Sequence, residues 1–305
     1  MRLLNASGCL DALAAPDVAR SFDAYVTKTV TPLPRQGNAP VRIAETENGM
    51  LNAIGLANRG IEEFSRYTLP RLARSLGVPI WVSVGGFSTR DYAGICRRLD
   101  ERDEVDTIEL NLSCPNVDEV PGNVAEVVAT ARAATSKPLY AKLSPAVPDV
   151  AETARAAAAA GADGLSLVNT IRGLALDERS LRPVLSRGAG GLSGPALRPI
   201  ALAAVHACYR ATRLAIVGMG GVATGRDALE LLAAGASDVA VGTALFADPA
   251  AARRIRAELA AELAARGFAN ADNAVGAAHG TSRTLDHESR VLPKKALHIG
   301  INMAG

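Results

Sequence analysis

A thiol and several amides follow one β-rich segment of this 305-residue sequence. The stretch IELNLSCPN, residues 108–116, alternates apolar and polar residues and then places Asn111 and Cys114 close together. A thiol in a loop beside a strand end can take a proton once its pKa is lowered toward the working pH. A cysteine that only fills space is the simpler alternative. Cys114 is the candidate for chemistry, and Cys9, Cys96 and Cys208 are expected to be packing residues.

Two lysines stand at the ends of other β-rich segments. Lys28 ends residues 23–28, and Lys142 lies at the end of residues 138–143. A cation at Lys142 can stabilise a developing anion or form a Schiff base. The alternative for either lysine is a side chain that extends into solvent.

Several asparagines fall near the same strand ends. An amide offers a donor and an acceptor side by side, which complements a heterocyclic imide whose ring edge alternates C=O and N–H groups. Some of these residues are expected to be turn and cap asparagines instead. They are Asn52, Asn58, Asn111, Asn116 and Asn169.

Two glycine turns follow the last two β-rich segments. The sequence GMGG occupies residues 218–221 and VGTA occupies residues 241–244. Glycine turns let backbone N–H groups approach an anion, and barrel enzymes bind phosphate after their seventh and eighth strands. Each turn alone could be an ordinary tight turn. Their occurrence at consecutive strand ends favours a phosphate site.

These residues require a scaffold that brings many strand ends to one rim. Short β-rich runs alternate with amphipathic or alanine-rich segments, as in a parallel βα protein. The strand candidates are residues 3–6, 23–28, 79–84, 107–112, 138–143, 164–168, 214–218 and 238–241. The helix candidates are residues 61–76, 89–102, 124–134, 147–160, 197–211, 225–234 and 249–266. Eight strands predict an α/β fold of the (β/α)8 TIM barrel type, and an open doubly wound sheet lacks its early G-x-G-x-x-G turn.

Two connections are longer than a barrel needs, residues 29–60 and 169–196. Both follow strand carboxyl ends, where long insertions usually cover a ligand. Beyond about residue 270 the periodic pattern fails. We therefore predict one catalytic barrel domain over residues 1–269 and a tail over residues 270–305 that is irregular or partly disordered.

Composition limits the class of ligand and partner. With 33 basic and 31 acidic residues the net charge is +2, which predicts no nucleic-acid or membrane partner and favours a small neutral or acidic ligand. The four cysteines are widely spread, with no C-x-x-C pair and no histidine at ligand spacing, so no metal site or disulfide framework is expected. This usage is typical of a reduced, cytoplasmic protein.

The sequence resembles the class 1 dihydroorotate dehydrogenases of pyrimidine biosynthesis. The motifs that carry the resemblance appear in order between about residues 5 and 248: ASGC, TKTVT, GMLNAIGL, ELNLSCPNV, KLSP, GADGLSLVNT, VGMGG and GASDVAVGTALFADP. It resembles in particular the subclass whose catalytic subunit pairs with an FAD and iron–sulfur subunit and passes electrons to NAD. The resemblance implies an FMN-dependent oxidoreductase that converts dihydroorotate to orotate, with residues 1–269 as its FMN-binding barrel domain, and a homodimer.

The resemblance also implies residue roles. Cys114 would be the general base, and Lys142 would stabilise the reduced flavin. FMN would contact Ser7, Lys28, Thr29, Ser83, Asn111, Lys142, Val168, Gly194, Gly220, Gly221, Gly242 and Thr243. The substrate would contact Lys28, Asn52, Ala53, Ile54, Gly55, Leu56, Asn111, Asn169 and Thr170.

Two departures from the family pattern keep alternatives open. Ser83 stands where the family usually has Asn, and the segment after Cys114 is shorter than usual. A related FMN oxidoreductase acting on another pyrimidine or cyclic imide is one alternative. A barrel that serves as a non-catalytic subunit is the other, although such a subunit has no physical reason to keep this set of polar residues.

Overall fold

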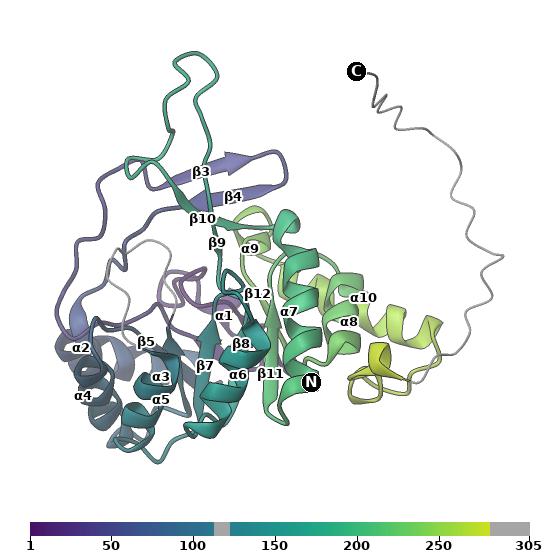
Figure 1. The fold of residues 1–305 in the computed structure, drawn as a ribbon, viewed down its shortest axis with the longest axis horizontal. Helices are drawn as coiled ribbons and strands as arrows, with labels where there is room; N and C mark the ends of the chain where they lie inside the picture. The colour runs from purple at the N-terminus through teal and green to yellow at the C-terminus, as the bar shows by residue number, and fades with distance from the viewer. Residues whose placement is uncertain (113–122, 281–305) are drawn as a thin grey trace, which may run out of the picture.

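The computed structural model describes residues 1–112 and 123–280, which contain a closed barrel of eight parallel strands (Figure 1). The order is β1-β12-β11-β8-β7-β6-β5-β2, and a parallel bridge between Leu4 and Ala24 joins the two end strands. The predicted barrel is therefore confirmed. Its strands are β1 (Leu3–Asn5), β2 (Tyr25–Val26), β5 (Ile80–Val84), β6 (Thr107–Asn111), β7 (Leu139–Leu143), β8 (Gly164–Leu167), β11 (Ala215–Met219) and β12 (Asp238–Val241).

The seam between β1 and β2 is closed by side chains as well as by the backbone. The amide of Asn5 accepts a hydrogen bond from the backbone N–H of Val26 and donates one to the Val26 carbonyl, both at 2.8 Å. The Asp23 carboxylate accepts the backbone N–H of Leu3 at 2.7 Å. Because β2 has only two residues, it offers few backbone groups for a ladder. The fully buried Asn5 side chain supplies the hydrogen bonds that a longer strand would make.

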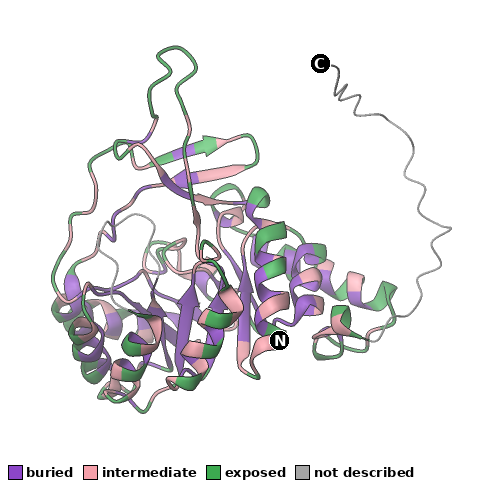
Figure 2. Ribbon diagram, viewed as in Figure 1, coloured by how far each residue is buried: buried purple, intermediate pink, exposed green. Residues whose placement is uncertain are grey.

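Helices cover the outside of the barrel, and the barrel strands are mostly buried (Figure 2). Apolar side chains fill the layer between helices and strands. Capping boxes start two of them, Ser88 with Asp91 and Thr224 with Asp227, and satisfy N–H groups of the first turn. In the described residues no helix is long and apolar enough to cross a membrane. The helices are α1 (Pro16–Ala19), α2 (Gly60–Glu63), the π-helix η1 (Phe64–Thr68), α3 (Leu69–Leu76), α4 (Thr89–Asp100), α5 (Val124–Arg132), α6 (Val150–Ala159), α7 (Arg198–Ala211), α8 (Gly225–Ala234), α9 (Ala244–Ala247) and α10 (Ala251–Ala265), with the 3-10 turns η2 (Pro195–Leu197), η3 (Asp272–Ala274) and η4 (Ala277–His279).

Aromatic and paired charged residues fill the amino end of the barrel interior. The rings of Trp81 and Tyr140 lie 4.6 Å apart, and the Arg2 guanidinium lies 5.1 Å from the centre of the Trp81 ring. Arg2 also pairs with Asp238 at 2.8 Å. These contacts close that end, and further polar side chains of the interior, such as Asn111 and Lys142, lie toward the carboxyl ends of the strands.

Both predicted insertions are present at the rim, but each contains two strands that the sequence pattern does not predict. The first contains β3 (Ile43–Thr46) and β4 (Gly49–Asn52), and the second contains β9 (Ile171–Gly173) and β10 (Gly190–Ser193). They form an antiparallel sheet in the order β3-β4-β10-β9, which lies over the carboxyl ends of the barrel strands (Figure 1). A small apolar cluster, which includes Leu51 and Leu185, supports this sheet.

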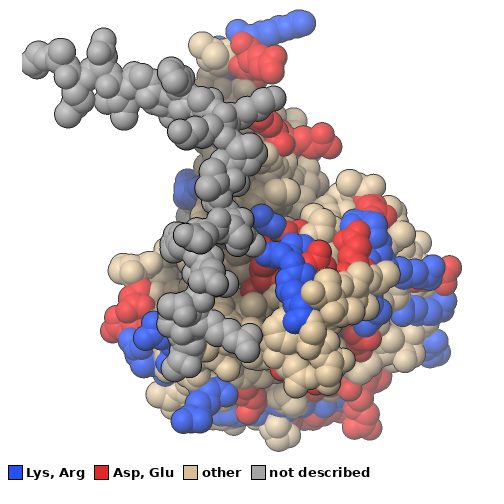
Figure 3. All heavy atoms as spheres, turned by 90° about the vertical axis from the view of Figure 1, so that its right-hand side faces the viewer, with Lys and Arg blue, Asp and Glu red and all other residues tan. Residues whose placement is uncertain are grey.

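Residues 270–280 pack against α8 through η3 and η4. The Nε2 atom of His279 lies 2.8 Å from the carbonyl oxygen of Ala234, and its ring stacks on His206 at 4.0 Å. On this side of the molecule α8 and α10 are linked by ion pairs such as Arg226 with Glu262, and basic and acidic side chains are interspersed over the surface (Figure 3). The domain boundary at residue 269 stays a prediction.

Because the Asn5 amide hydrogen-bonds across the seam between β1 and β2, we expect its loss to lower the stability of the protein strongly. Asn5→Ala is expected to lower the free energy of unfolding by about 2–4 kcal/mol, because it removes two hydrogen bonds and leaves the buried Val26 groups unsatisfied. Urea unfolding measures the change. Asn273→Ala, at an exposed asparagine, is the control and should change stability by less than about 0.5 kcal/mol. Equal stability of the two variants would contradict the role of Asn5.

Candidate active site

The antiparallel sheet and the carboxyl ends of the barrel strands enclose a cavity of about 530 Å³. This volume lies in the range of cofactor and small-molecule sites. Most of the predicted site residues line it: Ser7, Lys28, Thr29, Asn52, Ile54, Gly55, Leu56, Asn111, Lys142, Val168, Asn169, Thr170, Gly194, Gly220, Gly221, Gly242 and Thr243. Ser83 and Ala53 do not line it, and Cys114 and Asn116 lie outside the described residues.

Glycine turns form one end of the cavity. Gly220 and Gly221 follow β11 with φ values of +121° and +74°, and Gly242 follows β12. Within residues 1–112 and 123–280, no protein acceptor takes the backbone N–H groups of these three glycines. Available N–H groups in glycine turns suit a phosphate. This end of the cavity therefore has the donors that the two sequence motifs predict.

Close packing explains why glycine is needed in one of these turns. A Cβ atom at Gly221 would lie 2.7 Å from the Cβ of Arg198 and 3.0 Å from the carbonyl oxygen of Gly194. Gly194 itself has a φ of +97°, and the nearby Thr243 hydroxyl donates to the Ser193 hydroxyl at 2.8 Å. A side chain at position 221 would displace the turn that carries the N–H donors.

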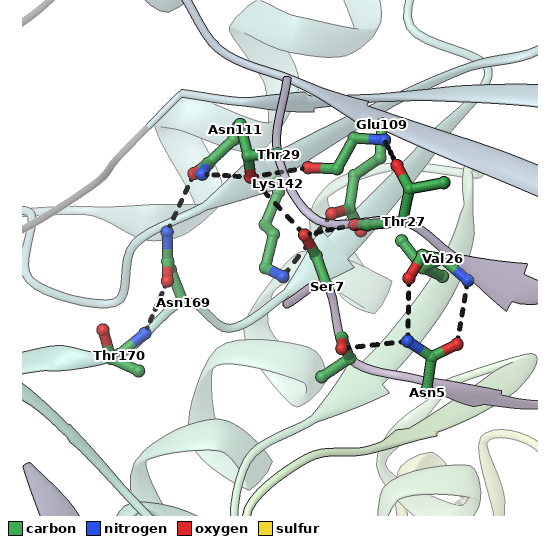
Figure 4. A network of polar contacts seen from close by, with 12 residues as sticks. Asn5, Ser7, Val26, Thr27, Thr29, Glu109, Asn111, Lys142, Asn169 and Thr170 are labelled. Atoms are coloured by element: carbon green, nitrogen blue, oxygen red, sulfur yellow. Dashed lines mark hydrogen bonds and ion pairs between the residues drawn. The ribbon is translucent and has the colours of Figure 1, made fainter. Parts of the chain in front are cut away.

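A chain of amides and hydroxyls lies at another side of the cavity (Figure 4). The Nδ2 group of Asn111 donates to Thr29 Oγ1 at 3.1 Å, and the Nδ2 group of Asn169 donates to Asn111 Oδ1 at 3.1 Å. The backbone N–H of Thr170 donates to Asn169 Oδ1 at 2.8 Å. These bonds fix which edge of each amide faces the cavity, so the amides can select the donor and acceptor pattern of a ligand.

Ser83 lies beneath this chain rather than at the cavity surface. It is fully buried, and its hydroxyl is 3.0 Å from the Thr29 hydroxyl. The Ser7 hydroxyl donates to the carbonyl of Thr27 at 2.8 Å and lies 3.4 Å from Thr29 Oγ1. Ser83 therefore supports Thr29, and through Thr29 the amides.

Two lysines place positive charge in the cavity. Lys142 is only 6% exposed, and its Nζ atom lies 3.5 Å from Oε1 of Glu109. The Lys28 side chain packs on Gly8, where an added Cβ would lie 3.2 Å from Lys28 Nζ. Glu109 is absent from the predicted site residues. The signal that could have revealed it is its alternation with Asn111, which places both side chains on the same face of β6.

The described cysteines have neutral thiols. Burial raises the pKa of Cys9, which lies in the cavity wall, although the positive charges of Lys142 and Lys28 act in the opposite direction. Burial raises the pKa of Cys96 and Cys208 to about 12. None of these three has the lowered pKa that an activated thiol needs.

Three residues of the first insertion differ in their placement. The Asn52 amide donates to the carbonyl of Gly191 at 3.3 Å and lines the cavity. Ala53 is fully buried in the cluster under the antiparallel sheet, so its side chain does not reach the cavity. Asn58 accepts the backbone N–H of Gly60 at 2.8 Å, as a turn asparagine does.

Comparison with known proteins identifies the family. A family model described as dihydroorotate dehydrogenase matches residues 2–263. This chain belongs to that family. Among its relatives is a protein of Desulforudis audaxviator, 47% identical over 265 residues, which cover 85% of this chain and 86% of the relative. Another, from Trichlorobacter lovleyi, is 46% identical over 264 residues, with 84% and 86% covered.

Both relatives are named dihydroorotate dehydrogenase B (NAD(+)), catalytic subunit. A solved structure, the ligand-free DHODH of Eimeria tenella, has a TM-score of 0.79 with 24% sequence identity. The alignment covers 91% of this chain and 89% of the Eimeria chain. At that identity the likeness supports the barrel fold of the dihydroorotate dehydrogenases.

The cavity suits FMN, the cofactor of the dihydroorotate dehydrogenase family. The N–H groups of Gly220, Gly221 and Gly242 would hold the phosphate, and Lys142 with the amide chain would hold the polar edge of the ring. The cavity thus offers an anion site and a hydrogen-bonding site within one enclosed volume.

The packing around Gly221 predicts a specific loss of FMN. Gly221→Ala should raise the FMN dissociation constant by about ten- to a hundredfold, because the new methyl group displaces the turn from Arg198. Flavin released per mole of denatured protein measures retention. Gly267→Ala is a matched control, since Gly267 has a similar φ of +73° with no neighbouring atom within 4 Å of its added Cβ. Full FMN content in Gly221→Ala would refute the assignment.

Proposed function

We propose that this chain oxidises dihydroorotate to orotate in pyrimidine biosynthesis, with FMN as the hydride acceptor. The observation that supports this most strongly is the convergence of Lys28, Asn111 and Asn169 on one cavity that Lys142 also lines. Together these residues suit a small, anionic, imide-containing ring. The family membership of the chain supports the same reaction.

In this proposal Lys28 binds the carboxylate of the substrate, and the amides of Asn111 and Asn169 bind the edge of its ring. Because these two amides already hydrogen-bond each other at 3.1 Å, their orientation is set before a ligand binds. The remaining proposed contacts come from Asn52, Ile54, Gly55, Leu56 and Thr170, which line the cavity, whereas the buried Ala53 supports this segment from below.

The oxidation removes a proton from one ring carbon and a hydride from the neighbouring carbon. Bound FMN supplies the hydride acceptor. Cys114, close to Asn111 in the sequence, takes the proton as a thiolate and becomes a thiol. Lys142 holds a positive charge in the buried part of the cavity, where it favours an electron-rich ring.

The chain is also proposed to act as a catalytic subunit in the cytoplasm, with an electron-transfer partner that carries FAD and an iron–sulfur cluster. The two relatives are named catalytic subunits of an NAD-linked enzyme, which supports a partner subunit. A second copy of the chain is a further proposed partner. It is supported by the exposed Leu174 and Leu181 on the segment between β9 and β10, which projects from the molecule (Figure 1).

The absorption spectrum of the purified protein tests the activity. We expect bound flavin whose absorption band bleaches when dihydroorotate is added without oxygen. Dihydrouracil, which lacks the carboxylate that Lys28 is proposed to bind, should bleach the band far more slowly. A flavin that stays oxidised with dihydroorotate would rule out this substrate, and equally fast reduction by dihydrouracil would contradict the proposed role of Lys28.

Replacement of the proposed base predicts a slow but still assembled enzyme. Cys114→Ser should slow anaerobic flavin reduction by about 100- to 10,000-fold, because a serine hydroxyl is a far weaker acid than a thiol. FMN content and orotate affinity should stay near those of the parent protein. Stopped-flow absorbance measures the rate, and Cys96→Ser, in α4, controls for the loss of a thiol elsewhere. Parent-like reduction in Cys114→Ser would exclude the base role.

A further inference from the structure

A buried carboxylate lies under the cavity without a role in the reaction described above. Glu109 is 1% exposed, and its side chain points into the barrel from β6. Its register neighbours are Ser83 on β5 and Tyr140 on β7. Glu109 does not line the cavity, whereas Asn111, two residues later on the same face, does. The carboxylate therefore lies one layer deeper than the residues that meet a ligand.

Lys142 links this carboxylate to the cavity. Its Nζ atom lies 3.5 Å from Glu109 Oε1, and its side chain lines the cavity wall (Figure 4). Lys142 is the register neighbour of Asn111, toward the carboxyl end of β7, so it stands between Glu109 and the ligand space. The carboxylate does not touch a ligand in the cavity, so its contact with the ligand space runs through the charge and position of this lysine.

A carboxylate at this depth is costly for the fold. A buried ion pair often contributes less stability than apolar residues of the same volume, so stability alone does not explain Glu109. The neighbouring interior cluster contains Trp81, Tyr140 and Val217, which shows that the barrel accepts apolar side chains. The low dielectric of this layer makes the field of the carboxylate strong at Lys142.

We propose that Glu109 is a positioning residue that holds Lys142 and partly neutralises its charge, and thereby sets the reduction potential of the bound FMN. Reduction adds electron density to the flavin, and a positive charge nearby favours the reduced form. Glu109 limits that preference, so the cofactor can pass its electrons on after the substrate has reduced it. The proposal rests on FMN binding in the cavity, which is part of the proposed function.

The test is the midpoint potential of FMN in the Glu109→Gln variant, measured by reductive titration with a reference dye. Removal of the carboxylate leaves the full charge of Lys142, so the ratio of reduced to oxidised flavin at a fixed potential should rise at least about tenfold, a shift of about 30 mV for a two-electron couple. Glu104→Gln is the matched control. It removes a carboxylate paired with Arg102 just before β6, at the opposite end of the barrel, and should leave the potential unchanged.

A double-variant cycle separates this role from a general loss of structure. In the Lys142→Met background, the further change Glu109→Gln should shift the potential far less than it does alone, since the lysine that carries the effect is missing. An equal shift in both backgrounds, or an unchanged or lowered potential in Glu109→Gln, overturns the proposal. If Glu109→Gln gives too little folded protein, Glu109→Asp replaces it. Moving the carboxylate away from Lys142 should raise the potential by a smaller amount, and no rise overturns the proposal.

These measurements do not use dihydroorotate. A normal potential in Glu109→Gln, with flavin that dihydroorotate bleaches, would reject only the role of Glu109. A raised potential with flavin that dihydroorotate leaves oxidised would instead reject only the proposed substrate.

Discussion

The hydrogen bonds between the Asn5 amide and the backbone of Val26 close the barrel, and the site depends on this closure. The chain leaves β1 and β2 at the same end of the seam, so the next residues of each strand meet there. The Ser7 hydroxyl reaches the carbonyl of Thr27, and the Lys28 side chain packs on Gly8. Without the seam, neither Lys28 nor Thr29 would be held beside the amides from β6 and β8.

Charge is unevenly distributed in a protein whose net charge is only +2. On the surface between α8 and α10, acidic and basic groups neutralise one another at short range, and such exposed pairs contribute little to stability. In the cavity, Lys142 is buried and Lys28 is partly buried, so their charges are less screened than those of the surface pairs. The placement of these two cations at one strand rim therefore favours an anionic ligand, although the overall composition does not.

The sequence predicts the scaffold better than it predicts the cover of the site. Alternation along residues 107–112 and 138–143 is enough to place Asn111 and Lys142 at one rim, because parallel strands in a barrel end on the same side. The strands of the antiparallel sheet are missed because they are short, contain Gly49, Gly173 and Gly190, and gain their order from partners distant in sequence.

For two residues whose side chains point into the barrel, the sequence of their own strand is not enough to predict their position. A charged residue in an alternating strand usually marks the solvent face, so alternation places Glu109 on the same face as Asn111 but does not by itself show that this face lies inside the barrel. Ser83 is similar, since only the pairing of β5 with β6 and the contact with Thr29 show that it supports the site from below. The role of Cys114 rests on the sequence, because this residue lies outside the described part of the chain.

The antiparallel sheet has a further consequence for how a ligand enters. It joins segments that are far apart in the chain, as in the bond from Asn52 to Gly191 across 139 residues, and its own buried apolar cluster is small. Contacts of that kind form late in folding and open first in the native state. The cover can therefore detach in local fluctuations that leave the barrel folded, and exchange of a bound molecule need not await global unfolding.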